Sequence, residues 1–291
     1  MNKSHSLATI LTLGTAQDGG YPHAGCRKSC CIGAWKDSSL NRLISSLAIA
    51  IKDKCWLIDI TPDFSRQLNM IENKLDGTVD IAGIFITHAH IGHYLGLLEL
   101  GLEVMHTYNI PVYVMPEMKS FLEGNAPFTQ LIALHNIQLK EISPDIPIQL
   151  NDDISVIPFL VPHRNEFSET AGFKVESENT SLIYISDIDS WESWDMDIND
   201  LIRENDTLLL DGTFYDSNEL DGRNIKDVPH PFIKDSLQKF SLLETVDRDK
   251  VYFTHFNHTN PVINSSGLEL LEINKHGCHI AEDDIIFTFN K

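Results

Sequence analysis

His88-Ala89-His90-Ile91-Gly92-His93 brings three imidazoles together within six residues, between two segments of different character. Residues 81–87 before it form a β-rich apolar run that predicts a buried strand, and residues 94–100 after it have the apolar spacing of a helix. A polar cluster at the carboxyl end of a strand in an α/β protein is expected to face a crevice rather than the core. Because neutral imidazole is the commonest metal ligand in proteins, this turn predicts a metal site.

The composition is that of a large, acidic, globular chain. With 291 residues, of which 42% are hydrophobic, the chain can bury a sizeable core, and we expect a single domain over residues 1–291. Asp and Glu number 42 against 22 for Lys and Arg, which gives a formal charge of -20 at pH 7. Such a charge repels phosphate backbones and anionic lipid surfaces. We therefore expect a small-molecule substrate, with neither nucleic acid nor a membrane as partner.

The sequence also bears on localisation. Residues 7–13 form a short apolar run without a clear small-x-small cleavage site, and we interpret them as the first strand. No stretch of the sequence approaches the roughly 18 apolar residues of a membrane helix. We expect a cytoplasmic protein.

Residues 14–36 are predicted to form a loop rich in Gly, Cys and charge, and this loop needs an anchor. Three of the five cysteines, Cys26, Cys30 and Cys31, are crowded within it. In a reducing compartment, near-adjacent cysteines more often bind metal or stay free than form disulfides. A structural zinc on these three thiols would anchor the loop, with His23 and Cys278 as candidates for the fourth ligand. Free thiols in an ordered loop are the alternative.

Elsewhere, apolar periodicity and turn residues indicate alternating strands and helices, followed by a region of short strands. We predict a hairpin of residues 45–52 and 55–59, helices at 64–73 and from the histidine turn to about 108, a strand at 112–114, and helical pieces within 116–134. Turn clusters at 143–145 and 151–153 divide residues 137–180 into strands that we expect to be mostly antiparallel.

Three later strands each end on a residue that can bind metal. Asp187 follows the apolar run 181–186, Asp211 follows 207–210, and His255 follows Val251-Tyr252-Phe253-Thr254. An isolated Asp after a strand is usually a turn or cap residue. Three such residues at the same ends of strands, together with the histidine turn, indicate a shared site instead.

The order of these motifs resembles that of the metallo-β-lactamase superfamily: a strand, His-x-His-x-x-His, a later His, a strand followed by Asp, and a strand followed by His. The resemblance implies a mixed α/β (α+β) fold, a four-layer αββα sandwich with metals at the edge between its two sheets. Within the superfamily the chain looks most like the PqqB branch, associated with biosynthesis of pyrroloquinoline quinone. That likeness rests on the Gly- and Cys-rich loop, on residues 210–214, and on Asn257-His258-Thr259-Asn260-Pro261.

The resemblance also implies two metal positions that share one carboxylate. It assigns His88, His90 and His163 to the first position, His93 and His255 to the second, and Asp187 to the bridge between them. The family pattern has Asp where this chain has Gly92, so the second position loses one anionic ligand. We expect one tightly bound metal and a weak or empty second position.

His230, in Pro229-His230-Pro231, resembles a histidine that phosphodiesterase members such as ribonuclease Z pair with an acid at the position of Asp211. An Asp that orients a His and raises its proton affinity builds a general acid, so Asp211 and His230 can protonate a leaving group. The alternative is a histidine held by two prolines in a surface turn.

Together these residues suffice for metal-assisted hydrolysis of an ester, a phosphodiester or a related substrate, with Asp187 orienting the attacking hydroxide. Zinc is the expected metal, although His and Asp also accept iron and manganese. A second interpretation uses His88, His90 and Asp187 as a two-His, one-carboxylate Fe(II) set in an oxidoreductase of quinone cofactor biosynthesis. A third, favoured by Gly92, is a metal-binding protein without catalysis.

Overall fold

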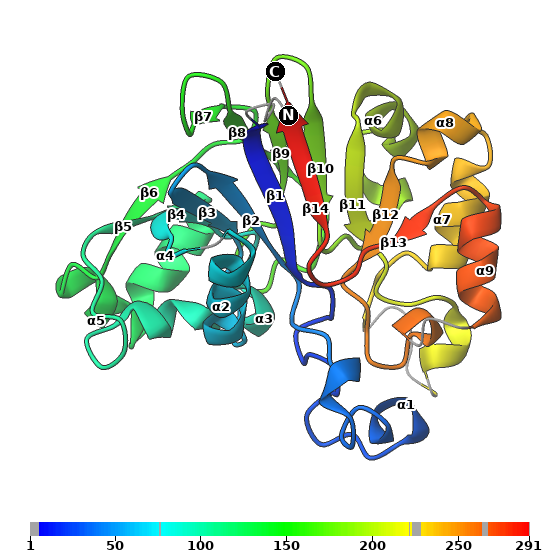
Figure 1. Ribbon diagram of the computed structural model, residues 1–291, viewed down its shortest axis with the longest axis horizontal. Coiled ribbons are helices and arrows are strands. Elements are labelled where there is room, and N and C mark those ends of the chain that lie inside the picture. Colours follow the sequence, from blue (N-terminus) through cyan, green and yellow to red (C-terminus); the bar gives the residue numbers. More distant parts are fainter. Residues whose placement is uncertain (1–5, 76, 221, 223–227, 264–266, 291) are drawn as a thin grey trace.

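Two sheets of seven strands each form the body of the described chain, which in this computed structural model comprises residues 6–75, 77–220, 222, 228–263 and 267–290 (Figure 1). In hydrogen-bonded order, the first sheet contains β14 (Ile286–Asn290), β1 (Ser6–Gly14), β2 (Ser46–Ile51), β3 (Lys54–Ile58), β4 (Asp80–Phe85), β5 (Ile110–Val114) and β6 (Ile137–Glu141). The second contains β13 (His279–Ile280), β12 (Val251–Thr254), β11 (Thr207–Asp211), β10 (Ser181–Ile185), β9 (Ala171–Glu176), β8 (Ser155–Leu160) and β7 (Ile148–Gln149).

Each sheet has an antiparallel half and a parallel half. Strands β14, β1, β2 and β3 pair antiparallel, as do β7, β8, β9 and β10. Strands β3 to β6 and β10 to β13 pair parallel. The predicted hairpin is β2 and β3, and Lys52 in its turn has a φ of 58°. Because the carboxyl ends of parallel strands lie at one edge, the residues that follow them are brought to the same side of a sheet.

Each sheet buries one face against the other sheet and its opposite face under helices (Figure 1). The inner core takes large side chains from both sheets, among them Phe85 of β4 and Tyr184 of β10. The helices that cover the first sheet are α2 (Phe64–Lys74), α4 (Pro116–Gly124) and α5 (Phe128–Ala133). Those that cover the second are α6 (Ile198–Glu204), α7 (Ile233–Phe240) and α9 (Leu268–Lys275). This arrangement confirms the predicted αββα sandwich.

Three further helices are single turns: α1 (Ser29–Ile32), α3 (Ile91–Tyr94) and α8 (Thr245–Arg248). The predicted helix at 64–73 is confirmed as α2, which at 11 residues is the longest helix of the described chain. Within that part of the chain, no helix has both the length and the apolar character that spanning a bilayer requires.

Two predicted elements differ from the structure. The helix expected to reach about residue 108 is instead α3 followed by a 3-10 helix at Leu95–Leu100. A Cβ on Gly96 would lie 2.3 Å from the carbonyl oxygen of Thr61, so this segment is packed too closely against its neighbour for an ordinary helix surface. The strands predicted within 137–180 are mostly antiparallel, as expected, and β6 is the exception: it runs parallel to β5, because α4 and α5 form a crossover that returns the chain to the same sheet.

The start of the 14–36 loop is fastened to the C-terminal segment through the half-buried carboxylate of Asp283. Asp283 accepts hydrogen bonds from the hydroxyl of Thr15 and from the backbone amide of Leu43, both at 2.7 Å. Arg42 donates to the same hydroxyl at 3.2 Å. Burial raises the pKa of Asp283 to about 6, although these hydrogen bonds and the Arg42 charge oppose the shift.

This pKa predicts a pH-dependent contribution to stability that Asp283→Asn removes. The folded-state value of about 6 lies above the ordinary Asp value near 4, so between these pH values the native state binds more protons than the unfolded state. Wild-type stability therefore falls, relative to that of the variant, as the pH rises through this window, by on the order of 2 kcal/mol. Urea unfolding of both proteins between pH 4.5 and pH 7.5 measures this difference, and a gap that stays constant with pH contradicts it.

Candidate functional site

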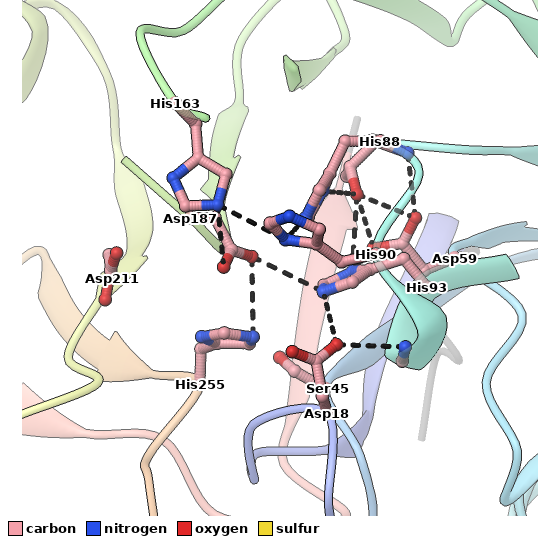
Figure 2. Close-up of polar contacts among 12 residues, drawn as sticks. Asp18, Ser45, Asp59, His88, His90, His93, His163, Asp187, Asp211 and His255 are labelled. Atoms are coloured by element: carbon pink, nitrogen blue, oxygen red, sulfur yellow. Dashed lines mark hydrogen bonds and ion pairs between the residues drawn. The ribbon is translucent and has the colours of Figure 1, made fainter. Parts of the chain in front are cut away.

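Side chains from the carboxyl ends of strands in both sheets converge on one point between the sheets (Figure 2). Four of them, His88, His90, His163 and Asp187, each offer a ligand atom, and these atoms lie within 4.8 Å of one another. Nδ1 of His90 is 2.8 Å from Nε2 of His88 and 3.4 Å from Nε2 of His163. Nitrogens bound to one tetrahedral zinc at about 2.0 Å are roughly 3.3 Å apart, so this group fits a metal ion.

A second group shares Asp187 with the first. Oδ2 of Asp187 is 3.5 Å from Nε2 of His93 and 3.4 Å from Nε2 of His255, whereas Oδ1 is 3.7 Å from Nε2 of His163. The two groups therefore lie on either side of one shared carboxylate. Nε2 of His93, Nε2 of His255 and Oδ2 of Asp187 are buried and have no hydrogen-bond partner among the described residues. Buried polar atoms are rarely left unpaired, and a cation between these three would satisfy them all.

Hydrogen bonds behind the histidines fix which ring nitrogen faces the centre. Asp59, fully buried just after β3, accepts the amide proton of Thr87 at 2.8 Å and its hydroxyl proton at 2.9 Å. Since that hydroxyl donates to Asp59, it accepts the Nδ1 proton of His88 at 3.0 Å. Nδ1 of His93 donates directly to Asp59 at 2.7 Å. Both rings thus hold a proton on Nδ1 and present Nε2 to the centre, as metal ligation requires.

The same device orients the two histidines contributed by the second sheet. The Thr213 hydroxyl donates to Asp211 at 2.7 Å and so accepts the Nδ1 proton of His255 at 3.0 Å. Nδ1 of His163 donates to Asp189 at 2.8 Å. Each ring is held from behind and turns its Nε2 toward Asp187. This arrangement is typical of metal-binding histidines, whose second nitrogen is bonded to a carboxylate or another oxygen.

The electrostatics of the site favour neutral rings at His88, His90 and His255, and an ionised carboxylate at Asp187. Burial lowers the pKa of His88 well below its usual range and also lowers the pKa values of His90 and His255. Burial would raise the pKa of Asp187, but the surrounding imidazoles outweigh it and hold that pKa well below its usual range. At His93, burial is outweighed by nearby carboxylates, with Asp59 foremost, and the pKa rises to about 10. These carboxylates favour positive charge at this point, which a divalent cation can supply.

His230 and Asp211 form the predicted pair at the edge of the metal ligands. Nδ1 of His230 donates to Oδ2 of Asp211 at 2.7 Å, and the same oxygen accepts the amide proton of Ile188 at 3.0 Å. The His230 and His163 ring centroids are 5.4 Å apart. Burial lowers the pKa of His230, but the Asp211 carboxylate outweighs it and raises that pKa above its usual value. The alternative of a surface turn is wrong, because His230 is only 4% exposed.

The three clustered cysteines form a separate group together with His258. Sγ of Cys26 is 3.6 Å from Sγ of Cys30, and Nδ1 of His258 is 3.6 Å from Sγ of Cys30 and 3.4 Å from Sγ of Cys31. The four ligand atoms lie within 4.8 Å of one another. Sulfur atoms at about 2.3 Å from a tetrahedral zinc are roughly 3.7 Å apart. The group therefore has the composition and spacing of a structural zinc site with three thiolates and one imidazole.

The fourth member of this group differs from both candidates named by the sequence. The ring of His23 packs against that of His258, with centroids 4.4 Å apart, and Cys278 is buried in the core under the second sheet. His258 lies 227 residues after Cys31. Cysteine spacing carries no information about a ligand so distant in the chain.

Sequence reasoning also missed the two carboxylates that orient the histidines from behind. Asp59 directly follows strand β3 at its carboxyl end, which is the same signal that identified Asp187 after β10. Asp189 lies two residues after Asp187, and this closeness in the sequence is the signal that could have identified it. The rule that a metal-compatible residue ends a strand would have found the first of these, if it had been applied to the hairpin.

The chain is similar to known proteins over most of its length. A family model described as a beta-lactamase superfamily domain matches residues 56–256. A coenzyme PQQ synthesis protein B of Klebsiella pneumoniae is 26% identical, in a match that covers 96% of this chain and 97% of that protein. The Zn(2+)-bound PqqB structure from Methylobacterium extorquens has a TM-score of 0.81 at 22% identity, covering 96% of this chain and 99% of that one. A diphosphatase from the PhnP family has a TM-score of 0.69 at 24% identity, covering 97% and 98%.

The two groups can be tested as independent metal centres with a pair of variants. His90→Ala removes a ligand that is part-exposed, so the fold is little disturbed, and we expect it to lose the metal of the histidine group while the cysteine group keeps its zinc. Cys30→Ser should do the reverse. The measurement is zinc per chain by elemental analysis after dialysis against EDTA. Each variant is the control of the other, and a His90→Ala protein with the full wild-type zinc content would show that His90 does not hold a metal ion.

Proposed function

The chain belongs to the beta-lactamase superfamily domain family, and from this premise we propose that it is a metal-dependent hydrolase of an ester, phosphodiester or related bond. The observation that carries the proposal is the position of Asp187, shared by two metal-compatible groups beside the buried His230–Asp211 pair. Such a site combines metal ligands with a proton donor, which are the two elements that metal-assisted hydrolysis needs. The acidic net charge of -20 supports a small molecule rather than nucleic acid as substrate.

The proposed metal ligands are His88, His90 and His163 with Asp187 at the first position. At the second position they are His93, Asp187 and His255. A zinc ion or a similar divalent cation bound there would supply a Lewis acid and lower the pKa of a water ligand toward about 7. The unpaired buried nitrogens and oxygen of the second group support this assignment.

The protein's own residues would divide the remaining work. The Asp187 carboxylate can accept a hydrogen bond from the attacking water and so orient it between the two groups. His230, with Nδ1 bonded to Asp211, can donate its Nε2 proton to the oxygen of the leaving group. Until that proton is transferred, Asp211 stabilises the His230 imidazolium, because a carboxylate partner raises the proton affinity of the ring.

Arg164 supports an anionic substrate. It follows His163 directly, and its Nε is buried without a hydrogen-bond partner among the described residues. Its Nη1 lies 3.8 Å from Oε1 of Glu166, a distance that leaves the guanidinium only loosely paired. A guanidinium with unpaired N–H groups suits recognition of phosphate or carboxylate oxygens. The likeness to a diphosphatase of the PhnP family points in the same direction.

A second candidate is an iron-dependent oxidoreductase. His88, His90 and Asp187 can serve as a two-His, one-carboxylate set for Fe(II). The observation that favours it is similarity over 96% of the chain to a protein named for coenzyme PQQ synthesis. Redox chemistry would not require the proton donation assigned to His230, so this histidine separates the two candidates.

His230→Ala should lower turnover of an activated ester or phosphodiester by roughly 10²- to 10⁴-fold, the usual range for one positioned acid–base group. The metal should stay bound, because His230 belongs to neither ligand group. The measurement is kcat with the zinc-loaded protein, together with zinc per chain. His279→Ala is the matched control, since it removes another histidine paired with an aspartate, 3.0 Å from Asp249 and away from the site, and should leave kcat unchanged.

The same preparation, loaded anaerobically with Fe(II), is assayed for oxygen uptake in the presence of quinone-precursor compounds. Iron-dependent uptake without zinc-dependent hydrolysis would overturn the hydrolase proposal in favour of the oxidoreductase. A metal-loaded protein that is inactive in both assays would favour a metal-binding protein without catalysis.

A further inference from the structure

The second metal position is one carboxylate short of the family motif, because Gly92 stands where the motif has Asp. Gly92 lies in α3 and has no side chain to offer. His93, Asp187 and His255 supply three ligand atoms between them. Zinc in proteins is usually four-coordinate, so this position has room for one more ligand, which either water or a residue from elsewhere in the chain can supply.

Asp18, from the loop after β1, lies directly against Gly92, and Figure 2 shows its carboxylate facing His93. Its Oδ1 accepts the amide proton of Gly92 at 2.9 Å and lies 3.6 Å from Nε2 of His93. A Cβ built on Gly92 would be 2.3 Å from that same oxygen. The Asp18 carboxylate therefore occupies the volume that a side chain at position 92 would fill.

Backbone hydrogen bonds hold this part of the loop beside the second group. The carbonyl of Thr15 accepts the amide proton of Phe256 at 2.7 Å, and the amide of Gln17 donates to the carbonyl of Phe256 at 2.9 Å. Phe256 directly follows His255, so the segment that ends at Asp18 is bonded to the segment that carries a metal ligand. Asp18 is placed by the main chain rather than by a long side chain reaching across solvent.

We infer that Asp18 is the carboxylate ligand of the second metal position, where it replaces the side chain that Gly92 lacks. The inference rests on the metal centre of the proposed function, not on the reaction. The second position then has two imidazoles and two carboxylates, Asp18 and the shared Asp187. Two metal ions are expected at the centre, in place of the weak second position that the sequence predicted from Gly92 alone. Because carboxylate oxygens suit Mn²⁺, manganese is the informative probe.

This assignment also explains why Gly92→Asp would not strengthen the second position. The new Cβ would lie 2.7 Å from the Cα of Asp18 as well as 2.3 Å from its Oδ1. The variant would push the existing carboxylate away rather than add another. The Asp18 carboxylate can therefore occupy its place only because residue 92 is a glycine.

The test is Asp18→Asn in the full-length protein, loaded with Mn²⁺ and freed of excess metal by gel filtration. Asn keeps an oxygen that accepts the Gly92 amide proton but removes the anionic charge. We expect bound manganese to fall from about two ions per chain to about one, and the electron paramagnetic resonance signal of an exchange-coupled manganese pair to disappear. Zinc in the cysteine group, which thiolates favour over manganese, should be equal in both proteins and reports that the loop is folded.

Two further variants make the result specific. Asp63→Asn removes a carboxylate from the neighbouring segment, where it accepts the Ile44 amide proton and, within the described part of the chain, forms no hydrogen bond or ion pair with a proposed metal ligand. This variant should keep both manganese ions. Asp18→Ala removes both the charge and the hydrogen bond to Gly92. If Asp18 ligates, Ala and Asn lose the second manganese alike. If Asp18 only positions α3, Ala alone loses it, and the inference is overturned.

Wild-type protein that holds a single manganese would overturn the inference as well. These outcomes are independent of the hydrolase proposal, because the count of bound metal does not depend on which substrate is turned over.

Discussion

The buried, ionised carboxylate of Asp187 is the interaction on which the rest of the site depends. It is 2% exposed, and its Oδ2 has no hydrogen-bond partner among the described residues. A buried carboxylate is costly unless positive charge or donors surround it. Here the imidazoles that face it come from both sheets, His93 after β4 of the first and His255 after β12 of the second, and a cation held between them would supply that charge. The site therefore depends on the inner core, in which residues such as Phe85 and Tyr184 pack the two sheets against each other.

A layer of neutral and anionic oxygens behind the imidazoles holds each ring by its Nδ1 and so fixes its orientation before any cation arrives. Thr87 and Thr213 each donate to a buried carboxylate. Each hydroxyl oxygen therefore accepts the Nδ1 proton of a histidine, so the aspartate fixes the orientation of the ring through the threonine. Asp211 has a second role, because its other oxygen holds His230. One buried carboxylate thus orients a metal ligand and a proton donor together, which fixes the donor relative to the metal position. Pre-organisation of this kind reduces the reorganisation that binding and reaction would otherwise require.

The parts of the structure that the sequence predicted are those encoded locally. The histidine turn and the residues ending β10, β11 and β12 follow from periodicity, whereas the layered fold was implied by the resemblance of their order to the metallo-β-lactamase superfamily. Asp18 and His258 could not be found in this way, because their roles depend on which distant loops meet, and no spacing rule connects Asp18 to Gly92 across 74 residues. The prediction of a helix continuing to about residue 108 was wrong for a related reason. The apolar spacing after Tyr94 is helical, but the close packing at Gly96 is a tertiary constraint that the spacing does not reveal.

The 14–36 loop and the segment that follows β12 both contribute residues to the two candidate metal centres. His255 of that segment faces Asp187, and His258, three residues later, meets Cys30 and Cys31. The loop makes the matching pair of contacts, with Asp18 against the histidine centre and its cysteines against His258. Fixing a flexible loop costs conformational entropy, and that cost falls on whichever contact must order it. A zinc ion at the cysteine group would order the loop at one end. Binding of a metal by Asp18 at the other end would then cost less conformational entropy.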